Sequence, residues 1–202
     1  MQVINPTKKN SYFFTKANLW HLFLLVSMPT HCWAIILSFR DVQMIAERTN
    51  MFDAFAFVAY ILIFALAESC MVFLFALAAF PFLPKRWSTI QHTLALGLLS
   101  YISASWIILR QLNFWNDNRY GILVRFVDGS THPLKYGALI IIVIGVSVFL
   151  SIFLPILCID RSQVLLKKLT KLAQRIYDLA TIYLILDLLA ILLIIYRNLI
   201  LK

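Results

Sequence analysis

Charged side chains are scarce in this chain of 202 residues. Asp, Glu, Lys and Arg make up 13% of the sequence, and 62% of the residues are hydrophobic. A typical soluble domain has about 25% charged and about 45–50% apolar residues. The composition therefore excludes an ordinary soluble domain and predicts an all-α, polytopic membrane protein with a single transmembrane domain over residues 1–202.

Cysteines and catalytic motifs are also lacking. Cys32, Cys70 and Cys158 all lie in apolar runs and form no CxxC pair, so a disulfide framework is not expected. The chain has no HExxH, GxSxG, P-loop or Gly-rich dinucleotide motif. We therefore expect no enzyme activity, no catalytic residues, no metal site and no cofactor.

Acidic residues are few relative to basic ones. The chain has 9 Asp and Glu against 18 Lys and Arg, a formal net charge of +9. The basic residues lie between the apolar runs, which is typical of topology signals and contacts with lipid headgroups. This distribution does not favour nucleic acid as a partner.

Long apolar runs are the main feature that the sequence does contain. A bilayer core about 30 Å thick needs about 20 helical residues. The runs predict five transmembrane helices at residues 19–39, 52–80, 87–109, 136–159 and 179–196. Pro29 and Pro155 are expected to kink the first and fourth helices, because proline has no N–H to donate. Residues 40–51 are expected to form a short polar loop, and residues 122–127 a short strand.

A basic segment of a different character, residues 161–177, precedes the last run. Its apolar residues recur at helical spacing at Leu165, Leu169, Leu172 and Ile176. A basic amphipathic helix of this kind is expected to lie on the membrane surface and bind anionic lipid. The alternative is an extension of a neighbouring transmembrane helix into water. The residues expected to contact lipid headgroups are Arg161, Lys167, Lys168, Lys171 and Arg175.

The distribution of Lys and Arg between alternate loops indicates an orientation. They are slightly more numerous on the side of the amino terminus, and five of them are concentrated in the segment at residues 161–177. The positive-inside rule then places the amino terminus in the cytoplasm and the carboxyl terminus outside. We expect the cell (plasma or inner) membrane as the location.

Two carboxylates interrupt the apolar runs near their middle, Glu68 in the second and Asp187 in the fifth. A charge at the bilayer centre costs about 2.5–3.5 kcal/mol on insertion scales, so each is expected to be protonated or to face the bundle interior. At similar depth they either share a protonatable cation site or form separate hydrogen bonds across helix interfaces. Ala65 and Ser69 have the small-xxx-small spacing that permits close helix packing. His31 is expected to be a hydrogen-bonded packing residue.

The layout of the chain also carries a resemblance to a known family. The resemblance rests on residues 20–29 (WHLFLLVSMP), residues 83–99 (LPKRWSTIQHTLALGLL) and the outward-directed end after Tyr196. In these features the chain resembles the five-helix amino-terminal membrane module of the sulfatase-like phosphoglycerol and phosphoethanolamine transferases, which act on envelope lipids. The resemblance implies five spans, an inside amino terminus and an outside carboxyl terminus. Because that family's catalytic residues lie in a soluble domain and this sequence stops at Lys202, it implies a membrane module without the enzyme.

Together these features predict a non-catalytic anchoring or assembly subunit of a membrane complex. The expected partners are anionic lipid and either other membrane-protein subunits or further copies of the chain. The interfaces are expected on the small-residue faces of the second and third helices, with Glu68 and Asp187 as polar contacts. The alternative is a small proton- or cation-coupled transporter or channel that uses these two carboxylates.

Overall fold

The described part of the chain is helical throughout. The computed structural model describes residues 15–48, 50–115, 129 and 131–200, and no strand forms among them. Five helices are long and apolar enough to cross a bilayer, which confirms the all-α class and the number of long apolar helices. The elements are α1 (Lys16–Arg48), α2 (Met51–Ala79), the short 3-10 helix η1 (Phe80–Phe82), α3 (Thr89–Trp115), α5 (Pro133–Arg161) and α6 (Gln163–Ile200). The strand predicted at residues 122–127 lies outside the described residues.

The first helix is longer than predicted and takes up most of the expected loop at residues 40–51. α1 continues to Arg48, because the residues after Phe39 include neither glycine nor proline and Gln43 donates to Glu47 one turn later at 3.0 Å. The break comes at Asn50, whose side chain accepts a hydrogen bond from the Asp53 backbone N–H at 2.8 Å and so caps α2.

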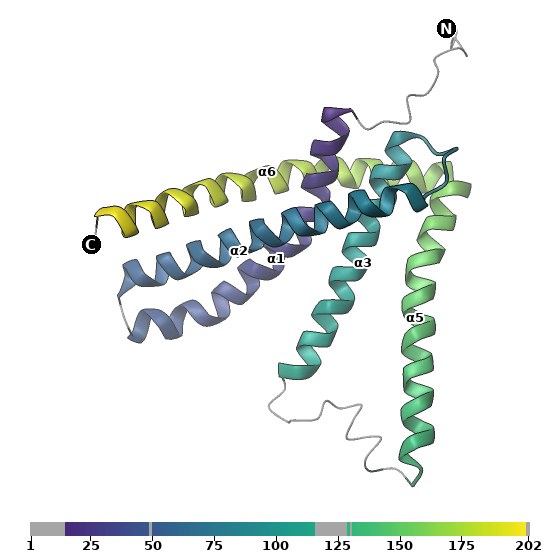
Figure 1. Cartoon of the computed structure of the whole chain (residues 1–202), viewed down its shortest axis with the longest axis horizontal. Coiled ribbons are helices and arrows are strands. Elements are labelled where there is room, and N and C mark those ends of the chain that lie inside the picture. Colours follow the sequence, from purple (N-terminus) through teal and green to yellow (C-terminus); the bar gives the residue numbers. More distant parts are fainter. Residues whose placement is uncertain (1–14, 49, 116–128, 130, 201–202) are drawn as a thin grey trace, which may run out of the picture.

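Helix α1 changes direction within its length (Figure 1). It contains Pro29, which cannot donate to the carbonyl one turn earlier. The bend allows the first part of α1 to run against α3 and the start of α6, while the later part runs beside α2.

The predicted surface helix and the predicted fifth span form one continuous helix, α6. No glycine or proline separates them, so nothing in the sequence ends the first before the second begins. At 38 residues α6 is about 57 Å long, nearly twice the thickness of a bilayer core. Only part of it can therefore lie in hydrocarbon.

The amphipathic half of α6 packs on the rest of the protein. Leu25 of α1 and Leu94 of α3 form a buried cluster with Ala173, and neighbouring apolar residues of α6 surround it: Leu166, Leu169, Ile176 and Tyr177. The predicted stripe was therefore partly wrong, because Leu172 is 53% exposed. Alanine at position 173 has no bulk that would hold α1 and α3 away, so the packed face is rotated toward it.

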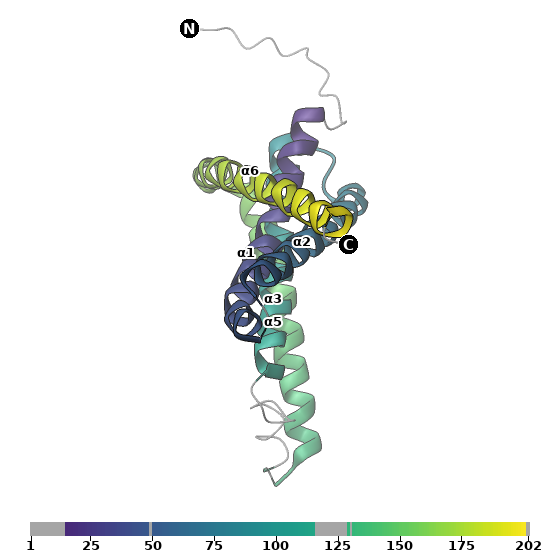
Figure 2. The same ribbon diagram turned by 90° about the vertical axis from the view of Figure 1, so that its left-hand side faces the viewer.

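The helices form two groups that run in different directions. α2 and α6 lie side by side in opposite directions with the later part of α1 against them, whereas α3 and α5 form an antiparallel pair that runs across them (Figures 1 and 2). α1 joins the groups, since Gly97 of α3 lies against Leu25 so closely that an added Cβ would be 2.9 Å from Leu25 Cδ1.

Ion pairs join the helices at the two ends of the chain's long axis. At one end Arg197 of α6 donates to Asp53 of α2 at 2.7 Å. At the other, Asp160 near the end of α5 accepts from Arg86 and from the Trp87 indole N–H, the latter at 2.7 Å. The apolar stretches of α2 and α6 lie between these polar ends, whereas α5 runs across them from the second end (Figure 1).

Candidate functional site: a polar centre beside an apolar cavity

A His–Asp pair lies where α1 and α6 cross. His31 Nε2 is 2.9 Å from Asp187 Oδ2, and the two residues are 0% and 2% exposed. His31 lies two residues after Pro29, so the bend of α1 is next to the pair. Asp187 lies in the middle of the apolar half of α6, and Ala180 and Ala190 on that helix are buried as well. Ala190 packs against Ala59 and Leu62 of α2 and Ile35 of α1, so small residues on α6 bring its backbone close to both helices.

The hydrogen bonds of His31 limit where its protons can be. Nδ1 is 2.8 Å from the carbonyl oxygen of Ser27, which can only accept, so Nδ1 carries a proton. The contact between Nε2 and Asp187 then holds one further proton, on the imidazole or on the carboxyl group. Both arrangements have zero net charge, which explains how two titratable groups can be buried in an apolar bundle.

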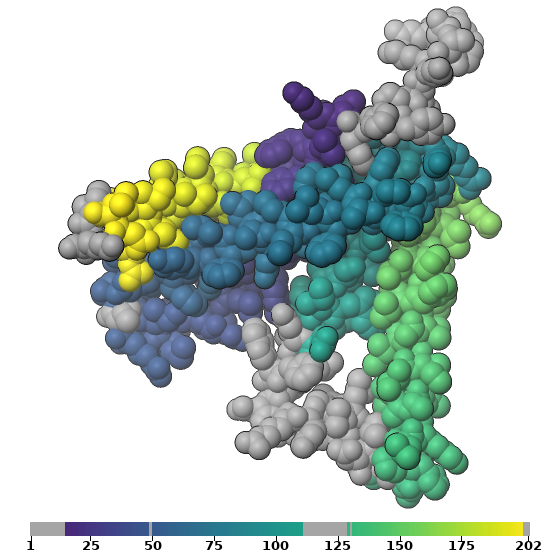
Figure 3. All heavy atoms as spheres, viewed as in Figure 1, coloured from purple at the N-terminus to yellow at the C-terminus, as the bar shows by residue number. Residues whose placement is uncertain are grey.

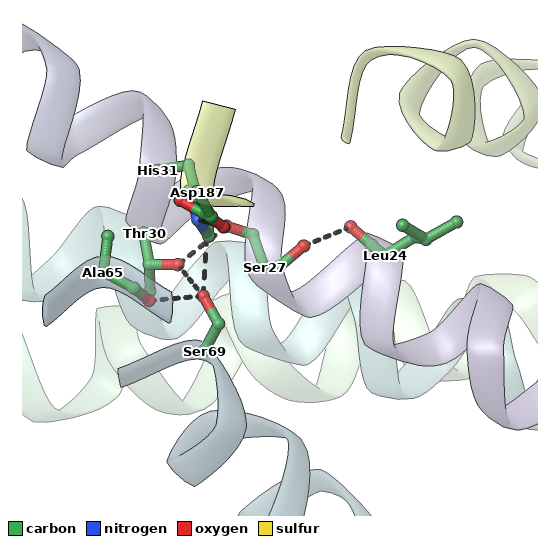
Figure 4. Close-up of polar contacts among 7 residues, drawn as sticks. All are labelled: Leu24, Ser27, Thr30, His31, Ala65, Ser69 and Asp187. Carbon is green, nitrogen blue, oxygen red and sulfur yellow. Dashed lines mark hydrogen bonds and ion pairs between the residues drawn. The ribbon is translucent and has the colours of Figure 1, made fainter. Parts of the chain in front are cut away.

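Two hydroxyl groups extend this centre to α2 (Figure 4). Ser69 Oγ is 3.4 Å from His31 Nδ1 and 2.5 Å from Thr30 Oγ1. Each hydroxyl also lies within hydrogen-bonding distance of a carbonyl oxygen on its own helix, Ser69 with Ala65 and Thr30 with Ser27. We call Ser27, Thr30, His31, Ser69 and Asp187 the polar centre; it ties α1, α2 and α6 together.

Tyr183 and Cys32 adjoin the polar centre. The ring of Tyr183 is stacked on that of His31 with centroids 5.9 Å apart, and its hydroxyl is 3.9 Å from Cys32 Sγ. Sequence reasoning missed Thr30 and Tyr183 and treated Ser69 only as a small residue. Hydroxyl-bearing residues within apolar runs were the available signal, because such side chains hydrogen-bond across membrane helices.

Glu68 does not meet Asp187. Ser69, the next residue, contacts the polar centre, so Glu68 has the depth that the sequence predicted but points about 100° away around α2. Glu68 is exposed, and it forms no hydrogen bond or ion pair with any residue that the structure describes. The structure thus brings His31 to Asp187 and leaves Glu68 apart from both.

An open cavity of about 640 Å³ adjoins Glu68 between α1, α2 and α3. Among the described residues that line it, Glu68 is the one charged side chain; the wall is otherwise mostly aliphatic and aromatic, with Trp33 on one side and Ser103 on another. Thr30 belongs both to this wall and to the polar centre. The cavity has the size and the mainly apolar lining of small-molecule sites in proteins.

The basic residues predicted to contact lipid are all exposed, and among the described residues no ion pair joins them to the polar centre or the cavity. They lie on the amphipathic half of α6 and at the end of α5: Arg161, Lys167, Lys168, Lys171 and Arg175.

Among the described residues no group of three or more His, Cys, Asp and Glu side chains is arranged to hold a metal ion. Comparison of the chain with protein-family models, with curated proteins and with solved structures finds no match. What the geometry offers is a net-neutral proton-sharing pair inside the bundle and a carboxylate on the wall of an apolar cavity.

Proposed function

We propose that the chain is a multi-pass integral membrane protein and a non-catalytic anchoring or assembly subunit of a membrane complex. The observation that carries the proposal is the uncovered state of α5. This helix has 29 residues, of which only Ile159 is buried, and none of its most apolar stretch is covered by the rest of the chain. In Figure 3 α5, in green, forms the outer edge of the molecule.

Part of the interface expected on α2 and α3 is used within the chain instead. Ala65, Ser69 and Ala76 of α2 are buried, and Asp187 is paired with His31. These side chains are therefore not available to a partner. Of the five long helices, α5 leaves the most apolar surface uncovered for a partner helix.

Gly145 marks a contact face on α5. A Cβ added at this glycine would meet nothing within 4 Å, although glycine in a membrane helix typically permits close approach of another helix. Ser151 on the same helix accepts a hydrogen bond from Trp106 of α3 at 3.0 Å. Gly145 lies about 120° around α5 from Ser151 and so faces away from α3.

Substitution Gly145→Leu tests the proposal. Because the site is open in the isolated chain, the variant should fold as well as the wild type but lose its partner. We expect a stoichiometric partner, another protein or a second copy, to co-purify from native membranes in mild detergent, with at least about tenfold less of it on the variant.

Val143→Leu is the matched control, since it adds bulk on the opposite side of α5 at a residue that is 54% exposed. It should retain the partner. A wild-type chain that purifies alone would contradict the subunit proposal. A partner kept by Gly145→Leu would contradict the assignment of the contact to α5.

A second candidate, proton- or cation-coupled transport, is favoured by the row of hydrogen-bonding groups from Thr30 on the cavity wall through Ser69 to His31 and Asp187. Intramembrane acids and histidines in rows are typical of proton relays. Proton flux into liposomes that contain the wild-type chain, and its loss in Asp187→Asn, would support transport. Flux equal to that of empty liposomes would contradict it. The likeness to the membrane module of envelope-lipid transferases stays a prediction.

A further inference from the structure

We propose that the cavity between α1, α2 and α3 binds a hydrophobic molecule that carries one positive charge, with Glu68 as its counter-ion. This binding site is independent of the subunit contact on α5, which lies on a different helix.

The charge of Glu68 points to a cationic ligand. A carboxylate in apolar surroundings is stable only when it is protonated or paired with a cation. Among the described residues Glu68 has no cationic neighbour, and none of those that line the cavity is Lys or Arg. Asp187, the other membrane carboxylate, is already paired with His31. Glu68 is therefore the acid for which the described residues supply no cationic partner.

The size and lining of the cavity suit a hydrophobic molecule. A volume of about 640 Å³ falls within the range of about 300–1,000 Å³ that is typical of small-molecule sites. Phe64 and Phe75 of α2 and Trp33 of α1 contribute aromatic rings to the wall. Apolar groups of a ligand would be buried against these rings, and aromatic faces also attract cations. A hydrophobic cation fits both features, because its apolar groups pack on the wall and its charge pairs with Glu68.

Protonation of the Glu68 carboxylate and binding of a cation to it exclude one another. No other titratable side chain lies in the wall that α1, α2 and α3 provide. Behind the wall, Thr30 and Ser69 separate the cavity from His31 of α1 and Asp187 of α6, and that pair is net-neutral. The ligand should therefore bind less tightly at acidic pH, because protonation removes the one charge that attracts it.

Tetraphenylphosphonium is a suitable probe, since it combines four aromatic rings with one positive charge. Tetraphenylborate has the same shape and a negative charge, so it reports partition into detergent or apolar surface. Equilibrium dialysis of the purified full chain should show saturable binding of the cation and none of the anion. The affinity for the cation should rise with pH.

Two variants test the site. Glu68→Gln should weaken binding of tetraphenylphosphonium at least about tenfold, about 1.4 kcal/mol, and remove its pH dependence. Ser103→Phe should weaken it as well, because the ring fills the cavity from α3 without altering Glu68. The control is Glu47→Gln, which neutralises an exposed glutamate near the end of α1, outside the cavity.

The proposal is overturned if the anion binds as well as the cation, or if Glu68→Gln binds the cation with wild-type affinity. Should Glu68→Gln fail to fold, the pH dependence of the wild type and the loss in Ser103→Phe decide the matter, and pH-independent binding overturns the proposal. A variant that no longer binds the probe should still keep its partner on α5. The cation-site proposal and the subunit proposal can therefore fail independently of one another.

Discussion

At the scale of single residues, the polar centre shows how an apolar bundle accommodates titratable side chains. His31 and Asp187 hold one proton between them, so their sum of charge is zero although both are buried. Removing one member of such a pair is costly, because the other is left unpaired, whereas replacing both with apolar side chains is often neutral.

We predict that His31→Leu lowers the free energy of unfolding by on the order of 3 kcal/mol, since Asp187 loses its partner. The double variant His31→Leu/Asp187→Leu should be more stable than His31→Leu alone. Reversible denaturation in detergent micelles, followed by helical circular dichroism, measures both. The single variant Asp187→Leu completes the cycle. If the double variant loses as much free energy of unfolding as His31→Leu and Asp187→Leu lose in sum, the two residues are not coupled.

Two glycines provide a second prediction at this scale. In Gly97→Ala the new Cβ would be 2.9 Å from Leu25 Cδ1 and 3.2 Å from its Cβ, so the Leu25 side chain must turn away and α1 must shift slightly from α3. We expect a loss of about 1–3 kcal/mol, the usual cost of overpacking. Gly145→Ala meets nothing within 4 Å and should keep or raise stability. Thermal unfolding of the purified chain distinguishes the two, and equal midpoints would contradict the tight contact at Gly97.

At the scale of elements, α6 joins a basic amphipathic half and an apolar half in one continuous helix. Its first half is basic on one side and packed through Ala173 on the other, and its second half is apolar around Asp187. Continuity ties the position of the basic half to that of the polar centre, because a helix without a break transmits any tilt or rotation along its whole length.

We predict that the basic half of α6 binds anionic lipid. Changing Lys167, Lys168 and Lys171 together to Gln should remove about 1 kcal/mol of attraction per lysine. Native mass spectrometry of the chain with mixed anionic and zwitterionic lipid should show fewer bound anionic lipids. Lys85→Gln, an exposed lysine outside this helix, is the control. Equal retention of anionic lipid by the triple variant would refute the prediction.

At the scale of the whole molecule, the polar ends give the chain two sides. The Asp53–Arg197 pair lies at the α1–α2 connection, near the carboxyl terminus, and the Arg86–Asp160 pair lies near the start of α6 (Figure 1). The exposed lysines of α6 belong to the second end. The positive-inside rule predicts that this end faces the cytoplasm.

Single cysteines test this orientation after Cys32, Cys70 and Cys158 are replaced by Ala. In intact cells a membrane-impermeant maleimide should label Glu47→Cys, at the outer end, but label Ser88→Cys only once the membrane is opened. Both positions are exposed on the protein. Labelling of both without opening the membrane would mean that α2 does not cross.

The apolar runs were sufficient to predict the helices themselves. Hydrophobic length fixes where the chain can cross hydrocarbon, so the five long helices were predictable. Their ends were less so: α1 passes through the expected loop at residues 40–51, and α6 fuses two predicted elements. Hydropathy detects where apolar residues give way to polar ones, whereas a helix ends only where proline, glycine or a capping residue ends it.

The sequence by itself determined the all-α class, the count of long apolar helices and the presence of titratable residues within them, because each depends on residues close together along the chain. Only the tertiary structure decided that Asp187 pairs with His31 while Glu68 points into a cavity. Helices that cross at an angle bring together residues far apart in sequence, and a rotation of about 100° separates neighbours such as Glu68 and Ser69. Which polar groups meet depends on the rotation and crossing of the helices, and local sequence patterns do not encode it.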